Sequence, residues 1–266
     1  MKFANFLKLA LLPLMAGVIA LSGCGATSSS NNLALTQGNW SMTVTSGGAA
    51  GTFYIGGNLT QTGTNLAGTL QFIGSSGCFP PSAPVTFSGT VNGHNVTLTS
   101  ASVAGQVLTI VASGTAGTAL SGTYTVAGGC DAGDQGTVTA SAVPSISGTW
   151  KGTIVDQNSE TVTVTMALTQ AATASTDGTF ALTGNLTYTG STCSISGTLT
   201  AGNAYISGTS IAMQGNTIES DNSAGNFTYY PYLNNPTSPT SMQGPYQQTF
   251  GVCTDANTYT ATFTKQ

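Results

Sequence analysis

Few side chains in this sequence of 266 residues can attack a substrate or carry a proton. Its one histidine, His94, stands in the turn sequence Asn92-Gly93-His94-Asn95, and a serine–histidine–aspartate triad would have to use it. No Gly-x-Ser-x-Gly turn, which presents the nucleophile of many hydrolases, occurs in the chain. We therefore expect a protein that is not an enzyme, with a surface hydrolase that uses carboxylates as the alternative.

Carboxylates are also scarce. Asp131 and Asp134, which follow Cys130, are the one close pair in the first repeat. Asp255 and Asn257 stand at the corresponding place after Cys253. Calcium needs several oxygen ligands, but aspartate also stabilises turns by bonding its own backbone. We expect a turn, with Asp131 and Asp134 as weak metal candidates and no cofactor. A glycosidase pair is not singled out by the spacing of the other carboxylates at Asp156, Glu160, Asp177, Glu219 and Asp221.

Aromatic side chains are the remaining groups suited to binding. Trp40 and Trp150 are candidates for lining a ligand pocket, with packing inside the fold as the preferred alternative. Tyr229, Tyr230 and Tyr232 fall in the segment 226–245, which we expect to be a long loop. Exposed tyrosines suit contacts with sugars or proteins, whereas a tolerated insertion is the alternative.

The elements that hold these residues come as two related segments of about a hundred residues. Four stretches match in order: Gly38-Asn39-Trp40 with Gly148-Thr149-Trp150, Asn58-Leu59-Thr60-Gln61 with Ala167-Leu168-Thr169-Gln170, Ser88-Gly89-Thr90-Val91 with Ser196-Gly197-Thr198-Leu199, and Tyr124 and Cys130 with Tyr246 and Cys253. The repeat predicts tandem domains at residues 38–143 and 148–266, joined by a linker at 144–147.

The cysteines fit this duplication, because four of the five fall two in each repeat. Four cysteines allow three pairings, and equivalent positions favour the disulfides Cys78–Cys130 and Cys193–Cys253. Such bonds persist in exported proteins.

Within each repeat, apolar and polar residues alternate with a period of two, as in strands with one wet face. Glycine recurs between apolar residues of the same face, for example in Phe87-Ser88-Gly89-Thr90-Val91, which indicates bends or close backbone approach. Closing a sheet requires such kinks. We predict an all-β fold of two tandem antiparallel up-and-down β-barrels of about eight strands each, with β-sandwiches as the alternative.

The Gly-x-Trp at residues 38–40, the strand count and the sequence Leu120-Ser121-Gly122-Thr123-Tyr124 resemble the avidin and lipocalin barrels. This resemblance is topological and loose, and it implies a closed barrel. It does not imply biotin binding, because tryptophan occurs only at positions 40 and 150, so the late-strand tryptophans of an avidin biotin site have no counterparts.

The N-terminus has the order of an export signal: Lys2 and Lys8, an apolar run over residues 9–21, then Ser22 and Gly23. The run is shorter than the roughly 20 residues that cross a bilayer, so residues 1–23 are predicted to be a signal peptide. Leu21-Ser22-Gly23-Cys24 resembles the lipobox of bacterial lipoproteins.

The lipobox resemblance implies that Cys24 is acylated and becomes the mature N-terminus, with residues 24–37 as a flexible tether to the membrane. Gly25 stands where the inner-membrane retention signal has aspartate, which favours the outer membrane. An ordinary secretory signal is the alternative.

Charged residues make up 5 % of the chain, against about a quarter in most proteins. Removing residues 1–23 leaves two lysines, no arginine and eight carboxylates, so the formal charge is −6. Nucleic acid is therefore not an expected partner. Our leading hypothesis is a non-catalytic cell-envelope lipoprotein, an interaction module or small-ligand-binding module whose partner is an unknown protein or glycan.

Overall fold

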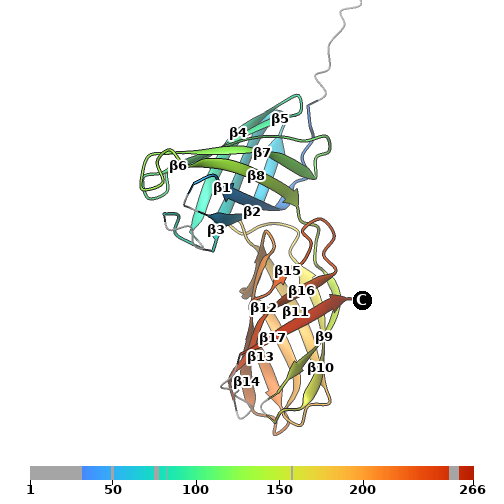
Figure 1. The fold of residues 1–266 in the computed structure, drawn as a ribbon. Helices are drawn as coiled ribbons and strands as arrows, with labels where there is room; N and C mark the ends of the chain where they lie inside the picture. The colour runs from blue at the N-terminus through green and yellow to red at the C-terminus, as the bar shows by residue number, and fades with distance from the viewer. Residues whose placement is uncertain (1–31, 49–50, 75–77, 82, 157, 252–257) are drawn as a thin grey trace, which may run out of the picture. The chain divides into compact units, whose positions relative to one another are not determined.

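The structure, a computed structural model, describes residues 32–48, 51–74, 78–81, 83–156, 158–251 and 258–266 (Figure 1). This part of the chain forms strands, turns and irregular segments. No helix with the length and apolarity to cross a membrane occurs in it. The predicted signal peptide and Cys24 lie outside the described residues.

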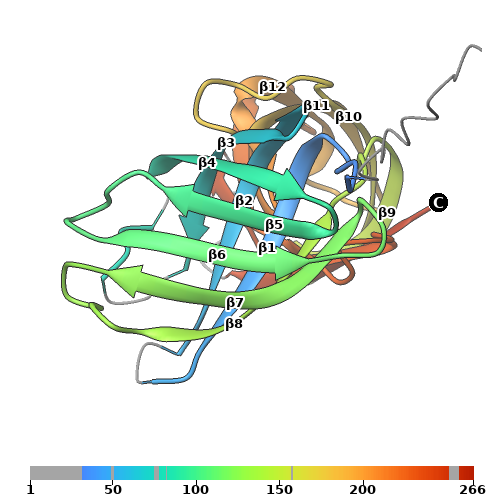
Figure 2. The same ribbon diagram turned by 90° about the horizontal axis from the view of Figure 1, so that it is seen from above.

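Eight strands form the first barrel, each antiparallel to its neighbours in chain order (Figures 1 and 2). Pairing of the first strand with the eighth closes the sheet, with Met42 opposite Ala140. The strands are β1 (Gly38–Ser46), β2 (Thr52–Thr62), β3 (Asn65–Ile73), β4 (Pro84–Asn92), β5 (Asn95–Ser100), β6 (Val107–Ser113), β7 (Ala119–Ala127) and β8 (Gln135–Ala142).

The second barrel repeats this meander. Its strands are β9 (Gly148–Val155), β10 (Thr161–Gln170), β11 (Phe180–Thr189), β12 (Ser194–Ser207), β13 (Ser210–Glu219), β14 (Ala224–Tyr229), β15 (Tyr232–Leu233), β16 (Ser241–Phe250) and β17 (Tyr259–Lys265). Pairing of β12 with β13 and of β17 with β9 closes the ring, and the short β15 pairs beside β13 and β16. The prediction of two closed antiparallel barrels is confirmed, and closure excludes the sandwich alternative.

Alternation along each strand produces the two cores. In β6, Leu108, Ile110 and Ala112 point inward and are buried, whereas Val111 is exposed. The buried side chains form one cluster in each barrel. Removing apolar area from water stabilises a fold by roughly 25 cal/mol per Å², so the period of two selects which face of each strand turns inward.

Inward-facing glycines let neighbouring strands approach closely. A Cβ atom on Gly89 would lie 1.9 Å from the carbonyl oxygen of Thr97, and one on Gly122 would lie 2.1 Å from that of Val111. Both contacts are with the backbone of the adjacent strand, which cannot move aside. Glycine is therefore required at these points of close backbone approach.

The segment 226–245 is not the long loop that the sequence suggested. Most of it belongs to β14, β15 and β16. Pro231 lies in the short break between the end of β14 at Tyr229 and the start of β15 at Tyr232. Proline cannot donate a ladder hydrogen bond, so its position explains the break. The tyrosines consequently alternate: Tyr229 points into the barrel, while Tyr230 and Tyr232 point to solvent.

Candidate functional site

Each barrel holds its tryptophan in the same way. Trp40 and Trp150 are both completely buried, and each indole nitrogen donates to the backbone carbonyl four residues earlier, Thr36 at 2.7 Å and Ile146 at 2.8 Å. Because both barrels bury the ring and form the same hydrogen bond to it, we interpret the two tryptophans as part of the scaffold.

A matched glutamine fixes the segment that precedes each first strand. Gln61 Oε1 accepts from the amide of Leu35 at 2.7 Å, and Gln170 Oε1 accepts from that of Ile146 at 3.0 Å. Leu33, Leu35 and Ile146 are buried. Residues 33–36, assigned to the flexible tether, are thus held against the first barrel, and Ile146 of the predicted linker joins the second core.

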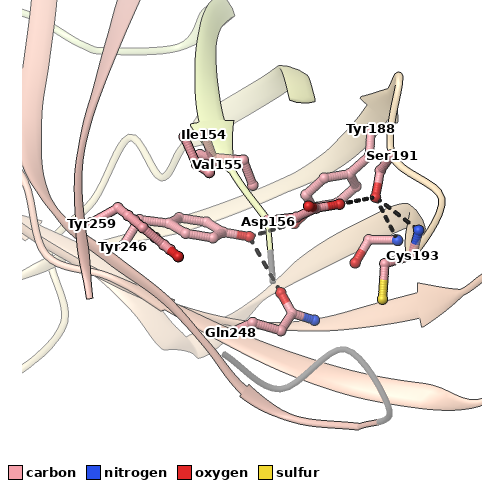
Figure 3. Close-up of a pocket in the computed structure, with 10 residues that line it drawn as sticks. Ile154, Val155, Asp156, Tyr188, Ser191, Cys193, Tyr246, Gln248 and Tyr259 are labelled. Carbon is pink, nitrogen blue, oxygen red and sulfur yellow. Dashed lines mark hydrogen bonds between the residues drawn. The ribbon is translucent and has the colours of Figure 1, made fainter. Parts of the chain in front are cut away.

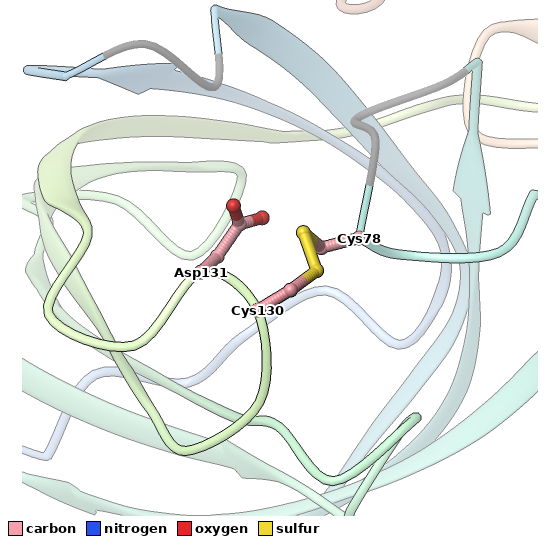
Figure 4. Close-up of side chains that lie close together, drawn as sticks. All are labelled: Cys78, Cys130 and Asp131. Carbon is pink, nitrogen blue, oxygen red and sulfur yellow. A yellow bond between two sulfur atoms is a disulfide. The ribbon is translucent and has the colours of Figure 1, made fainter.

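Cys78 and Cys130 form the predicted disulfide in the first barrel, with a Cα–Cα distance of 5.9 Å. Asp131 lies beside it (Figure 4), and its Oδ2 atom is buried without a hydrogen-bond partner. Among the described residues this is the one grouping of three acidic, histidine or cysteine side chains close enough to share an ion. Two of its three ligand atoms are the bonded sulfurs, so it offers a metal one free ligand.

Asp134, the other weak metal candidate, is engaged inside the first barrel. Its carboxylate accepts from Ser46 Oγ and from the Tyr124 hydroxyl, both at 2.6 Å. Burial, and then the hydrogen bond to Asp134, raise the pKa of Tyr124 to about 12. Both oxygens of Asp134 are therefore occupied by hydroxyl groups of the first barrel.

The second predicted disulfide is described at one end only. Cys193 is disulfide-bonded and buried, and its expected partner Cys253 lies outside the described residues.

A polar network occupies the interior of the second barrel (Figure 3). The hydroxyls of Tyr188 and Tyr246 are 2.9 Å apart, Tyr246 donates to Gln248 Oε1 at 3.5 Å, and Gln248 Nε2 donates to Thr217 Oγ1 at 2.9 Å. Glu219, which is also completely buried, follows Thr217 on the same face of β13. Burial raises the pKa of Tyr188 and of Tyr246 well above the usual range. Sequence reasoning named Glu219 only as one carboxylate of five and missed the other four.

The carboxylates near the opening of this barrel support loops. Asp156 Oδ1 accepts from the amides of Asn158 and Glu160, both at 3.0 Å. Glu160 accepts from the amide and hydroxyl of Thr192, and the backbone bond is the larger cause of its lowered pKa. The cavity beneath Asp156 and Ser191 has a volume of about 20 Å³, enough for a water molecule.

The first barrel keeps the matched tyrosine, Tyr124, but has apolar residues at two other positions of this network. Counted from the matched Leu59 and Leu168, Phe72 occupies the position of Tyr188. Val126 occupies the position of Gln248, because each lies two residues after the matched tyrosine. Stacked rings fill the space instead, with Phe72 and Phe79 centred 4.4 Å apart. The polar residues at the Tyr188 and Gln248 positions therefore belong to the second repeat.

The predicted tyrosines divide between the inside and the outside of the second barrel. Tyr229 is completely buried and donates to the carbonyls of Met242 and Ala261 at 3.2 and 3.1 Å. Tyr230 and Tyr232 are 40 % and 53 % exposed. With Tyr205 they line a groove of about 280 Å³, which Gln71, Ile73 and Gly74 from the end of β3 also line. Gln214 Nε2 donates to the Tyr230 hydroxyl at 2.9 Å, which orients that ring.

No protein-family model and no curated protein sequence matches the chain.

Proposed function

We propose that the protein is a lipid-anchored, non-catalytic protein of the bacterial cell envelope that binds a neutral glycan in a groove on the outside of its second barrel, which the end of β3 also lines. The observation that carries the proposal is the groove in which Tyr205, Tyr230 and Tyr232 meet. Signal-like residues 1–23 and Cys24 support the envelope location.

The outside of the barrel fits a ligand better than the inside. Ligand pockets usually have volumes of about 300 to 1,000 Å³. The interior cavity beside Tyr188 and Tyr246 is about 20 Å³, whereas the tyrosine groove approaches the usual range at about 280 Å³. A small-ligand site of the lipocalin kind would need space that the packed interior does not offer.

The chemistry of the groove suits a sugar. Tyrosine combines a flat apolar ring, which covers the C–H face of a pyranose, with a hydroxyl that forms hydrogen bonds. Ser210 adds a hydroxyl group, and none of the described residues lining the groove is charged. A neutral polyhydroxyl ligand therefore matches it, and an ionic ligand has no counter-charge there.

Replacing Tyr230 and Tyr232 together with alanine is expected to weaken glycan binding at least about tenfold, because each lost ring contact is worth on the order of 1 kcal/mol. Neutral glycans immobilised on an array identify the ligand, and titration calorimetry with the purified protein measures the affinity. Ile195→Ala, which removes another exposed apolar side chain of the same barrel, should leave binding unchanged.

Two results would count against the glycan proposal. One is equal affinity of the double tyrosine variant and the unaltered protein. The other is turnover of glycosides that Asp156→Asn abolishes, which would favour the surface hydrolase instead.

Cys24→Ala is expected to move the protein from the membrane fraction to the soluble fraction, or to leave its signal segment uncut. Two or more acyl chains give stable anchoring, and the variant can carry none at this position. Fractionation followed by immunoblotting measures the change, with Ser22→Ala as the control. A Cys24→Ala protein that is cut and still pellets with membranes would contradict lipid anchoring.

A further inference from the structure

Thr217 and Gln248 bring a hydroxyl group against a carboxamide inside the second barrel. Thr217 lies on β13 and Gln248 on β16, and β14 separates these strands in the ring. Both side chains are buried, at 1 % and 7 % exposure, and Gln248 Nε2 lies 2.9 Å from Thr217 Oγ1. The carboxamide carbon is one bond beyond that nitrogen, so the Thr217 hydroxyl lies beside an acyl group, and such proximity favours reaction.

The carbonyl oxygen of Gln248 faces a buried donor. The Tyr246 hydroxyl donates to Oε1 at 3.5 Å, and the Tyr188 hydroxyl lies 2.9 Å from that of Tyr246. Donors fixed in a water-poor site stabilise the negative charge that develops on a carbonyl oxygen under attack. Such bonds often shorten as the charge forms. This arrangement polarises the carboxamide toward attack at its carbon.

Glu219 supplies a carboxylate on the same inner face. It follows Thr217 by two positions on β13 and is completely buried, and residues so spaced on a strand are about 7 Å apart. Ser223 Oγ donates to its Oε2 atom at 3.3 Å. Glu219 is the one acidic side chain of β13, and it is the base that an attack by the Thr217 hydroxyl would use.

We propose that Thr217 and Gln248 react to form an intramolecular ester that links β13 to β16. Thr217 Oγ1 attacks Gln248 Cδ while its proton passes to Glu219. The Oγ1–Cδ bond forms, the Cδ–Nε2 bond breaks, and the proton leaves Glu219 with the departing nitrogen as ammonia. The reaction needs no oxidant, reductant or cofactor, and exclusion of water protects the ester from hydrolysis.

The first barrel lacks the parts for this reaction. Val126 stands in place of Gln248 and Phe72 in place of Tyr188. The first barrel therefore folds without the residues that would react, although it keeps Tyr124 at the position of Tyr246.

Intact-mass spectrometry of the purified full chain tests the ester. The unaltered protein should weigh less than its sequence by one ammonia molecule beyond the changes due to processing and disulfides. Its digest should contain a branched peptide that joins Thr217 to Gln248. Thr217→Val, which keeps the shape of the side chain and removes the nucleophile, should restore the missing mass and yield two linear peptides.

Further variants separate the roles of the neighbours. Thr217→Ser should retain the link, because it keeps a hydroxyl group. Glu219→Gln and Tyr246→Phe should slow its formation at least tenfold in freshly refolded protein, while circular dichroism shows that the barrel is intact. Unmodified linear peptides carrying Thr217 and Gln248, recovered from the unaltered protein after prolonged incubation, would overturn the proposal, as would ammonia loss that fragmentation places elsewhere.

Discussion

Trp150→Ala is expected to lower the free energy of unfolding of the second barrel by about 3 to 5 kcal/mol, the range for large aromatic residues removed from a core. Trp150 is completely buried, and its truncation also leaves the carbonyl of Ile146 without the indole donor. Both losses act at the point where the segment before β9 meets the barrel. Denaturant unfolding followed by fluorescence and circular dichroism measures the change.

Tyr232→Ala is the control for that experiment, because its side chain is 53 % exposed and such surface changes usually stay within about 0.5 kcal/mol. Trp40→Ala should have a comparable effect on the first barrel, where the same burial and hydrogen bond occur. A loss of less than about 1 kcal/mol for Trp150→Ala would mean that the ring is not part of the scaffold.

Replacing Cys78 and Cys130 together with alanine is expected to destabilise the first barrel by about 4 kcal/mol. The disulfide joins residues 52 positions apart, and the chain-entropy estimate for a loop of this size gives that magnitude. The effect arises mainly in the unfolded chain, so the folded barrel should keep its structure. Urea unfolding of the variant and of the oxidised protein gives the difference.

Reduction of the unaltered protein provides the matched comparison, since it opens the same bond without changing the sequence. For the double alanine variant, the urea midpoint for unfolding of the first barrel should be the same with and without reductant. Equal midpoints for the variant and the oxidised protein would contradict the prediction.

The fold could be predicted from the sequence because its causes are local. A period of two selects the buried face of each strand, and glycines on that face mark close approach between strands. Phe87-Ser88-Gly89-Thr90-Val91 shows both signals, and in the structure Phe87 and Val91 are buried while Gly89 lies against the backbone of Thr97. The Asn92-Gly93 turn likewise joins β4 to β5, with Asn92 opposite Asn95.

The candidate sites were less predictable because their causes are not local. Tyr229, Tyr230 and Tyr232 looked alike in the sequence, yet register turns the first inward and the others outward. The pairing of Thr217 with Gln248 spans the intervening strand β14, and no short-range pattern signals a contact over 31 positions. In a sequence, polar residues at alternate positions of a strand also indicate its solvent-exposed face, whereas Thr217 and Gln248 point into the barrel.

The segment before β1 has a mechanical consequence. The amide of Leu33 donates to the carbonyl of Gly93, that of Leu35 to the side chain of Gln61, and that of Thr36 to the carbonyl of Gly117. Three separate parts of the first barrel thus hold one short stretch of chain by hydrogen bonds. A pulling force applied to the chain before Leu33 is therefore distributed over these three hydrogen bonds before it reaches β1. The hydrogen bonds between β1 and its neighbouring strands are consequently not broken one after another.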